Sequence, residues 1–151
     1  MAPPYSPEYK QNQSTIDRAL AQIHARKNRD YESYSEDELT VLRSWVCVQV
    51  IENGGLGFLF ERAMPLDDDY SQTISSLDAI GASKAADILR DVTSQFPRGR
   101  PPLDRIERCS QYQGFPEEVR NDVDGRFIDE VPSIAQSLVR FIQEHQLIDG
   151  S

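Results

Sequence analysis

The stretch that most constrains the fold is residues 35–63, SEDELTVLRSWVCVQVIENGGLGFLFERA. Ser35 and Glu38 have the spacing of a capping box, in which each side chain bonds the backbone of the other residue at a helix start. Apolar residues then recur at the three- and four-residue steps of one helix face: Leu39, Leu42, Trp45, Val46 and Val50. The pattern predicts a central helix that begins at Ser35 and buries Trp45.

Three residues predict where this helix stops: Asn53, Gly54 and Gly55. Glycine adopts the left-handed conformation that closes many helices without a penalty from a Cβ atom. The residues that follow, including Leu56, Phe58 and Phe60, are too apolar for a solvated loop. We expect the chain to turn here and return these side chains to the core.

The rest of the chain also has helical periodicity, and no segment alternates polar and apolar residues with the period of a strand. We predict an all-α fold, a single-domain orthogonal bundle of six or seven helices over residues 14–148. Residues 1–13 contain three prolines and are predicted to form a disordered or loosely packed arm. The last helix is expected to start at Pro132, since proline suits the first helical position.

Two simple features bear on localisation. The longest nearly unbroken apolar run, residues 45–51, is far shorter than the roughly 20 residues that span a membrane. The N-terminal residues have no basic segment followed by an apolar one, and the two cysteines form no disulfide framework. We expect a cytoplasmic protein that does not bind membranes.

The charge is the most informative bulk property. The 151 residues carry 25 acidic and 16 basic side chains, for a net charge of −9. Residues 1–34 have four acids and five bases, whereas residues 35–151 have the other 21 acids and 11 bases, or −10. Such an excess disfavours direct nucleic-acid binding, because phosphates would be repelled. An ordinary solvated surface and a surface that attracts a basic partner both remain open.

Motifs for catalysis are scarce. The two histidines lie in no metal-binding pattern, and the glycines at 54, 55 and 57 follow a helix with no lysine or hydroxyl residue in phosphate-binding register. The run Asp67 to Asp69 lacks the spacing of a calcium loop, and Asp122 with Asp124 lacks a nearby nucleophile. We therefore predict a protein that is not an enzyme and has no cofactor or metal, with a metal-dependent hydrolase using these aspartates as the alternative.

Several blocks together resemble a known family. They are residues 51–60 (IENGGLGFLF), residues 77–82 (LDAIGA) with Ala85 and Ile88 after them, Phe96-Pro97, and Asp124 with Phe127. In this order and separation they are similar to the bacterial family represented by the C-terminal domain of a DNA-mimic protein. The resemblance covers about residues 35–148 and implies an all-helical fold, in which the signature residues are caps and core: Asn53, Gly54, Gly55, Phe58, Phe60, Ile80 and Gly81.

The resemblance also implies a function. In the DNA-mimic member, an acidic face occupies the DNA-binding surface of a basic transcription factor. Carboxylates some 5–6 Å apart at helical i,i+3 and i,i+4 positions can present an array of charge comparable to phosphates. The signature residues are caps and core, so they transfer the fold to this chain and not the mimicry.

We therefore expect an acidic helical binding protein whose partner is a basic nucleic-acid-binding protein. An immunity-type inhibitor of a toxin such as a nuclease is the alternative with the same electrostatic basis. Several arginines dilute the acidic C-terminal half, and no heptad run indicates an oligomeric state. The candidate partner-binding residues are Asp67, Asp68, Asp69, Glu117, Glu118, Asp122, Asp124, Asp129 and Glu130.

Overall fold

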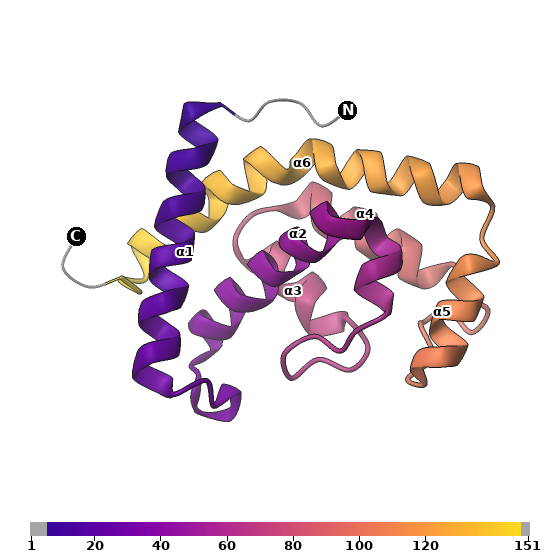
Figure 1. Ribbon diagram of the computed structural model, residues 1–151, viewed down its shortest axis with the longest axis horizontal. Coiled ribbons are helices and arrows are strands. Elements are labelled where there is room, and N and C mark those ends of the chain that lie inside the picture. The colour runs from indigo at the N-terminus through magenta and orange to yellow at the C-terminus, as the bar shows by residue number, and fades with distance from the viewer. Residues whose placement is uncertain (1–5, 149–151) are drawn as a thin grey trace.

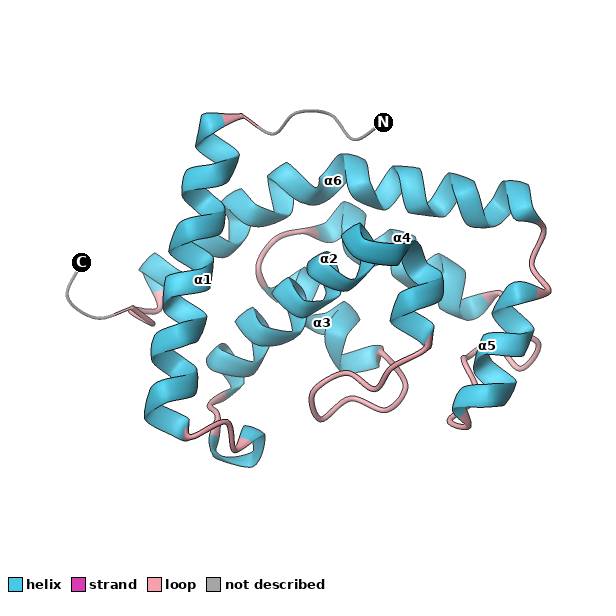
Figure 2. Ribbon diagram, in the orientation of Figure 1, coloured by secondary structure: helices cyan, strands magenta, loops and turns pink. Residues whose placement is uncertain are grey.

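The computed structural model describes residues 6–148, and within them it consists of helices joined by loops (Figure 1). The described residues contain no strand, only an isolated bridge between Met64 and Asp67 (Figure 2). The all-α prediction is confirmed, with six α-helices and one short 3-10 helix in this part of the chain. Their bounds are α1 Pro7–Lys27, η1 Tyr31–Ser33, α2 Glu36–Phe60, α3 Ser71–Ala79, α4 Ser83–Ser94, α5 Arg105–Gln113 and α6 Glu117–Glu144.

The first helix begins earlier than predicted. α1 starts at Pro7, and the hydroxyl of Ser6 caps it by accepting a hydrogen bond from the Tyr9 backbone N–H at 3.0 Å. Proline is favourable in the first turn, and the Tyr9 side chain is buried against the core. The predicted arm is therefore wrong for residues 7–13, and its residues 1–5 lie outside the described chain.

α2 is the central helix, as its pattern predicts. The capping box is present: the Glu38 backbone N–H donates to Ser35 Oγ at 3.1 Å, and the Ser35 N–H donates to Glu38 Oε1 at 2.8 Å. Trp45 is fully buried, and its indole N–H donates to Asp17 Oδ1 of α1 at 3.0 Å. This bond joins α2 to α1 and satisfies the one polar atom of the tryptophan.

The glycine pair interrupts α2 instead of ending it. Gly54 and Gly55 leave the helical conformation, Gly55 with φ 73°, and the helix resumes at Leu56. Leu56, Leu59 and Phe60 are buried, as expected, but Phe58 is 45 % exposed, so its predicted burial is wrong. A Cβ atom on Gly54 would lie 2.5 Å from the Phe58 ring, which shows that this ring folds back over the glycine.

α6 is longer than predicted. It runs unbroken from Glu117 to Glu144 with Pro132 inside it, whereas a new helix was expected to start at that proline. Val123, Phe127 and Val131 precede the proline on the buried face, so packing holds both halves in one helix. Tertiary contacts here outweigh the cost of an internal proline.

The helices are arranged around α2. α6 lies along the top of the molecule in Figure 1, α1 crosses its C-terminal part, and α5 lies below its N-terminal end. Between α3 and α4, Gly81 has φ 88° and follows the C-cap Ile80 of α3, which is buried, in agreement with the cap and core roles that the resemblance implies. The core is one cluster that includes Trp45, Phe60 and Phe127.

The burial of Trp45 gives a test of the fold. Replacing Trp45 with alanine should lower the free energy of unfolding by about 3–5 kcal/mol, because it leaves a large cavity and removes the bond to Asp17. Chemical denaturation of the two proteins measures the difference. The wild-type emission maximum should also be blue-shifted relative to free tryptophan, and a fully solvent-like maximum would contradict the buried position.

Candidate functional site

The N-terminal half of α6 carries most of the predicted acidic residues. Residues 117–130 contain six acids and two bases, and Val123 and Phe127 define the buried face. Glu118, Asp122 and Asp129 are exposed on the opposite side. Their i, i+4 and i+11 spacing places them roughly 6 and 10 Å apart along the axis at 1.5 Å per residue. We call these three residues the α6 acidic stripe.

One arginine lies beside this stripe. Arg126 contacts Asp122 across 3.4 Å, with both side chains at least half exposed. Exposed pairs of this kind contribute about 0–1 kcal/mol, so a partner could replace the arginine at little cost. The stripe is therefore only partly neutralised.

A hollow of about 490 Å³ lies between α4 and α6 and extends this acidic region. α4 contributes Asp87 and Asp91, and α6 contributes Asp129 and Glu130. Two cations, Lys84 and Arg126, and the apolar Ile88 complete the lining. Four carboxylates against two cations leave this hollow, which we call the α4–α6 acidic groove, with a net formal charge of −2.

Asp87 and Asp91 are residues that the sequence reasoning missed. The sequence does contain a pattern that could have indicated them: two aspartates four positions apart on α4. They lie on the side away from the buried Ala85, Ala86 and Leu89. Asp87 also pairs with Arg90, whose other nitrogen contacts Asp78 of α3, each at 2.5 Å. Only the packing of α4 against α6 brings these aspartates to Asp129 and Glu130.

Asp67 has a structural position, contrary to the prediction that it faces a partner. It is 3 % exposed, and its carboxylate accepts hydrogen bonds from the backbone N–H groups of Gln72 and Thr73 and from the Thr73 hydroxyl. These are free donors at the start of α3, so Asp67 acts as a cap for that helix.

The neighbouring aspartates remain at the surface. Asp69 is exposed and accepts hydrogen bonds from the Ser71 hydroxyl at 2.6 Å and the Ser71 N–H at 3.1 Å. These bonds hold the pKa of Asp69 below its ordinary value. Asp68 is exposed as well, but the α2–α3 loop that carries both lies at the bottom of Figure 1, whereas α6 lies at the top. The nine predicted residues do not form one continuous face.

Asp124 is also mainly structural. It is half-buried, and its Oδ1 accepts a hydrogen bond from the Leu56 N–H at 2.9 Å, across the break in α2. A Cβ atom on Gly55 would lie 2.5 Å from Asp124 Oδ2, so only glycine allows this close approach. Burial raises the pKa of Asp124, partly opposed by the Leu56 bond and by Arg120.

Glu117 and Glu118 were also predicted to bind a partner, and both are exposed in the first turn of α6. There they are favourable to the helix dipole whether or not a partner binds. Their role in partner binding stays a prediction.

Two arginines that dilute the acidic charge in the sequence are engaged by backbone carbonyls, and one of them is buried. Arg108 is buried, and its guanidinium donates to the carbonyls of Phe60, Pro102 and Leu103. Arg120 is partly buried and donates to the carbonyl of Phe115 at 3.1 Å. The acidic half of the chain thus presents fewer cations to solvent than its composition suggests.

The hydrolase alternative finds no support in these contacts. Asp67 and Asp69 are occupied by bonds to α3, and Asp122 and Asp124 are two positions apart on one helix and point in different directions. Within the described residues there is no group of three or more His, Cys, Asp or Glu side chains that could hold a metal ion.

Among the helices of residues 6–148, none combines the length and the apolar character that a membrane span requires.

The capping role of Asp67 can be tested against its exposed neighbour. Asp67→Ala should lower the free energy of unfolding by about 1–3 kcal/mol, because buried donors at the start of α3 lose their acceptor. Asp68→Ala should change it by no more than about 0.5 kcal/mol. Thermal or urea unfolding measures both, and equal effects would contradict the assigned cap.

The position of Asp124 predicts a pH dependence. A raised carboxyl pKa means that the unfolded chain loses its proton first as pH rises, so the ionised group lowers the free energy of unfolding from about pH 4 upward. In the Asp124→Asn variant, the amide oxygen can still accept the Leu56 bond without carrying a charge. The stability difference between Asp124→Asn and wild type should therefore shift in favour of the variant as pH rises from about 4 to about 7, with Asp122→Asn as the exposed control. A difference that does not change with pH would contradict this account.

Comparison with known proteins identifies the family of this chain. No curated protein and no solved structure matches the chain. A family model described as "DMP19-like protein" matches residues 32–145, which is more than half of the sequence. The matched range includes the interrupted helix α2 and the whole acidic half of α6. This chain belongs to the DMP19-like protein family, the DNA-mimic family that its sequence motifs resemble.

Proposed function

We propose that this chain binds a basic, DNA-binding protein through the α6 acidic stripe and the α4–α6 acidic groove. The bound partner could not hold DNA at the same surface, so the chain would act as an antirepressor or a related regulator. The observation that carries the proposal is the convergence of Asp87 and Asp91 with Asp129 and Glu130, in a member of the DMP19-like family.

The α6 stripe carries its charge more sparsely than DNA does, and the α4 carboxylates increase the local charge beside it. Duplex DNA presents one charge per roughly 1.7 Å of axis, whereas the α6 stripe alone presents one per roughly 6–10 Å. The α4 carboxylates add a second row beside the first, as the duplex has two strands of phosphates. Neighbouring stripe carboxylates lie roughly 6 and 10 Å apart along the axis, close to the Debye length of roughly 8 Å at physiological salt, so salt screens their combined field only in part.

The rigidity of the scaffold supports this function. α4 and α6 each bury a complete apolar face in the core, which fixes the carboxylates relative to one another before a partner arrives. Preorganised charges lose little conformational entropy on binding and favour fast, electrostatically steered association.

The test begins with affinity capture from the cells in which the protein occurs, with the full chain as bait. A second bait has the groove neutralised by Asp87→Asn, Asp91→Asn, Asp129→Asn and Glu130→Gln. The control bait neutralises four exposed glutamates elsewhere, at positions 8, 32, 61 and 144, so its net charge changes equally.

We expect the wild-type and control baits to retain a basic DNA-binding protein that duplex DNA displaces. The groove variant should bind it at least ~tenfold more weakly at low salt, and the difference should shrink as salt rises. Equal binding by all three baits, or a partner that DNA does not displace, would contradict the proposal. A captured nuclease inhibited by the chain would support the immunity-type inhibitor in its place.

A further inference from the structure

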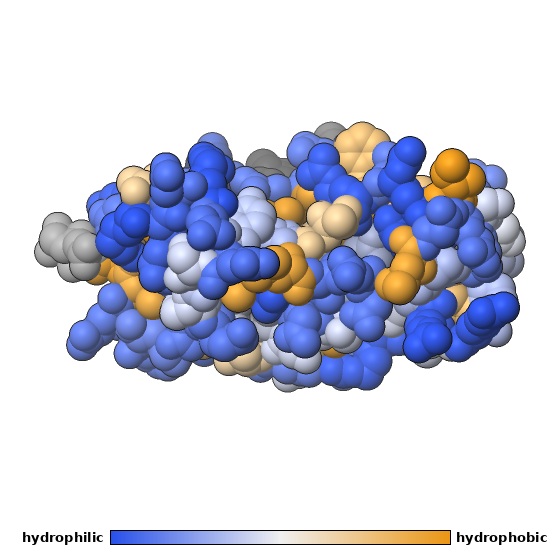
Figure 3. All heavy atoms as spheres, turned by 90° about the horizontal axis from the view of Figure 1, so that it is seen from below, coloured by the Kyte–Doolittle hydropathy of each residue, from blue (hydrophilic) through white to orange (hydrophobic). Residues whose placement is uncertain are grey.

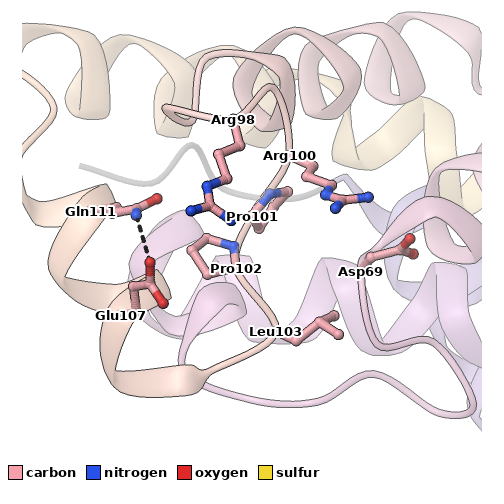
Figure 4. Close-up of a pocket in the computed structure, with 8 residues that line it drawn as sticks. All are labelled: Asp69, Arg98, Arg100, Pro101, Pro102, Leu103, Glu107 and Gln111. Atoms are coloured by element: carbon pink, nitrogen blue, oxygen red, sulfur yellow. Dashed lines mark hydrogen bonds between the residues drawn. The ribbon is translucent and has the colours of Figure 1, made fainter.

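The connection between α4 and α5 forms a second surface with different chemistry. It contains Gly99, whose φ of 75° allows a tight turn, followed by Pro101 and Pro102. A hollow of about 340 Å³ lies beside this turn. Its lining is drawn in Figure 4: Asp69, Arg98, Arg100, Pro101, Pro102, Leu103, Glu107 and Gln111.

Two arginines of this hollow keep their donors available. Arg98 and Arg100 are exposed, lie on either side of Pro101 in Figure 4, and make no hydrogen bond or ion pair with the other described residues. Each guanidinium has five N–H donors in a planar arrangement suited to a carboxylate. The contrast is with Arg43, which is buried and bonded to the carbonyls of Pro65 and Leu66.

The two carboxylates of the lining lie toward the ends of the hollow and already accept hydrogen bonds. Asp69 accepts from Ser71, and Glu107 accepts from Gln111 at 3.2 Å (Figure 4). Two arginines and two carboxylates make the lining formally neutral within a chain of net charge −9, and the guanidinium donors at its centre are not used by the other described residues. This local chemistry favours an anionic group.

Exposed apolar side chains adjoin the arginines. Leu103, in the turn before α5, is 70 % exposed, and Ile106, on α5, is 73 % exposed; among the described residues they are the most exposed large apolar side chains. Figure 3 views the molecule from below and shows apolar side chains interrupting the hydrophilic face, some of them in the part occupied by α5. Leu103 lines the hollow, and together with Ile106, three residues further on, it offers exposed apolar area to a partner.

We propose that this surface, made of Arg98, Arg100, Pro101, Pro102, Leu103 and Ile106, binds an extended segment of a partner protein that carries a carboxylate beside a bulky apolar side chain. The carboxylate bonds the two guanidinium groups, and the apolar side chain covers Leu103 and Ile106. The rest of the chain repels such a segment, so the arginines set its position. This occupant is acidic and contacts the α4–α5 turn, whereas the partner of the α4–α6 groove is basic.

A random peptide library displayed on phage, selected on the immobilised full chain at low salt, tests the proposal. The enriched peptides should contain aspartate or glutamate next to leucine, phenylalanine or a similar residue. One enriched peptide is then synthesised with a fluorescent label, and its affinity for the chain is measured by fluorescence anisotropy.

The double variant Arg98→Glu/Arg100→Glu should bind this peptide at least ~tenfold more weakly. The control Arg18→Glu/Arg140→Glu changes two exposed arginines on α1 and α6, so it has the same net charge and should bind as wild type does. Circular dichroism confirms that both variants are folded. No enrichment, enrichment of basic peptides only, or equal loss in both variants would overturn the proposal, and none of these results depends on the acidic groove.

Discussion

A hydrogen bond between α2 and α6 links the break in the central helix to the helix that carries most of the acidic residues. The Leu56 N–H, freed where Gly54 and Gly55 interrupt α2, donates to Asp124 of α6 across a separation of 68 positions. An interrupted helix exposes backbone donors that must find acceptors when they are not solvated. The acidic helix supplies that acceptor, so the break in the central helix also fixes where α6 lies. The carboxylates at 118, 122 and 129 take their positions from this contact and from the apolar face of α6.

The fold sorts its charges into two classes. Some are used internally: Asp67 caps α3, Glu38 closes the start of α2 and faces Arg26 and Lys27, and Arg108 bonds three carbonyls. The other charged side chains are exposed and determine the electrostatic potential of the surface. Net charge alone therefore describes this protein poorly, because the same residue types serve as helix caps in one place and remain exposed to solvent in another.

The two surfaces that we propose as binding sites differ in their chemistry. The α4–α6 acidic groove has a net formal charge of −2, and the α4–α5 turn offers two guanidinium groups and the exposed Leu103 and Ile106. A regulator that occupies a DNA-binding surface gains specificity if a second contact distinguishes its partner from other basic proteins, since charge alone selects weakly. The two proposals are nonetheless independent, because they rest on different elements of the fold.

The sequence by itself determined the helical class, the capping box at Ser35, the burial of Trp45, the irregularity at Gly54 and Gly55, and the family. The structural features follow from local rules: periodicity, capping chemistry and the conformational freedom of glycine. The family follows instead from the resemblance of several sequence blocks to known members, and the family model confirms it. Only the tertiary structure decided that Asp67 is inside, that Asp124 bonds Leu56, that Phe58 lies over Gly54, and that Asp87 and Asp91 join Asp129 and Glu130. Local pattern does not encode these outcomes, because each depends on which segment, distant in sequence, packs against the residue. The continuous helix through Pro132 has the same cause: the packing of Val123, Phe127 and Val131 outweighs a local signal for a helix start.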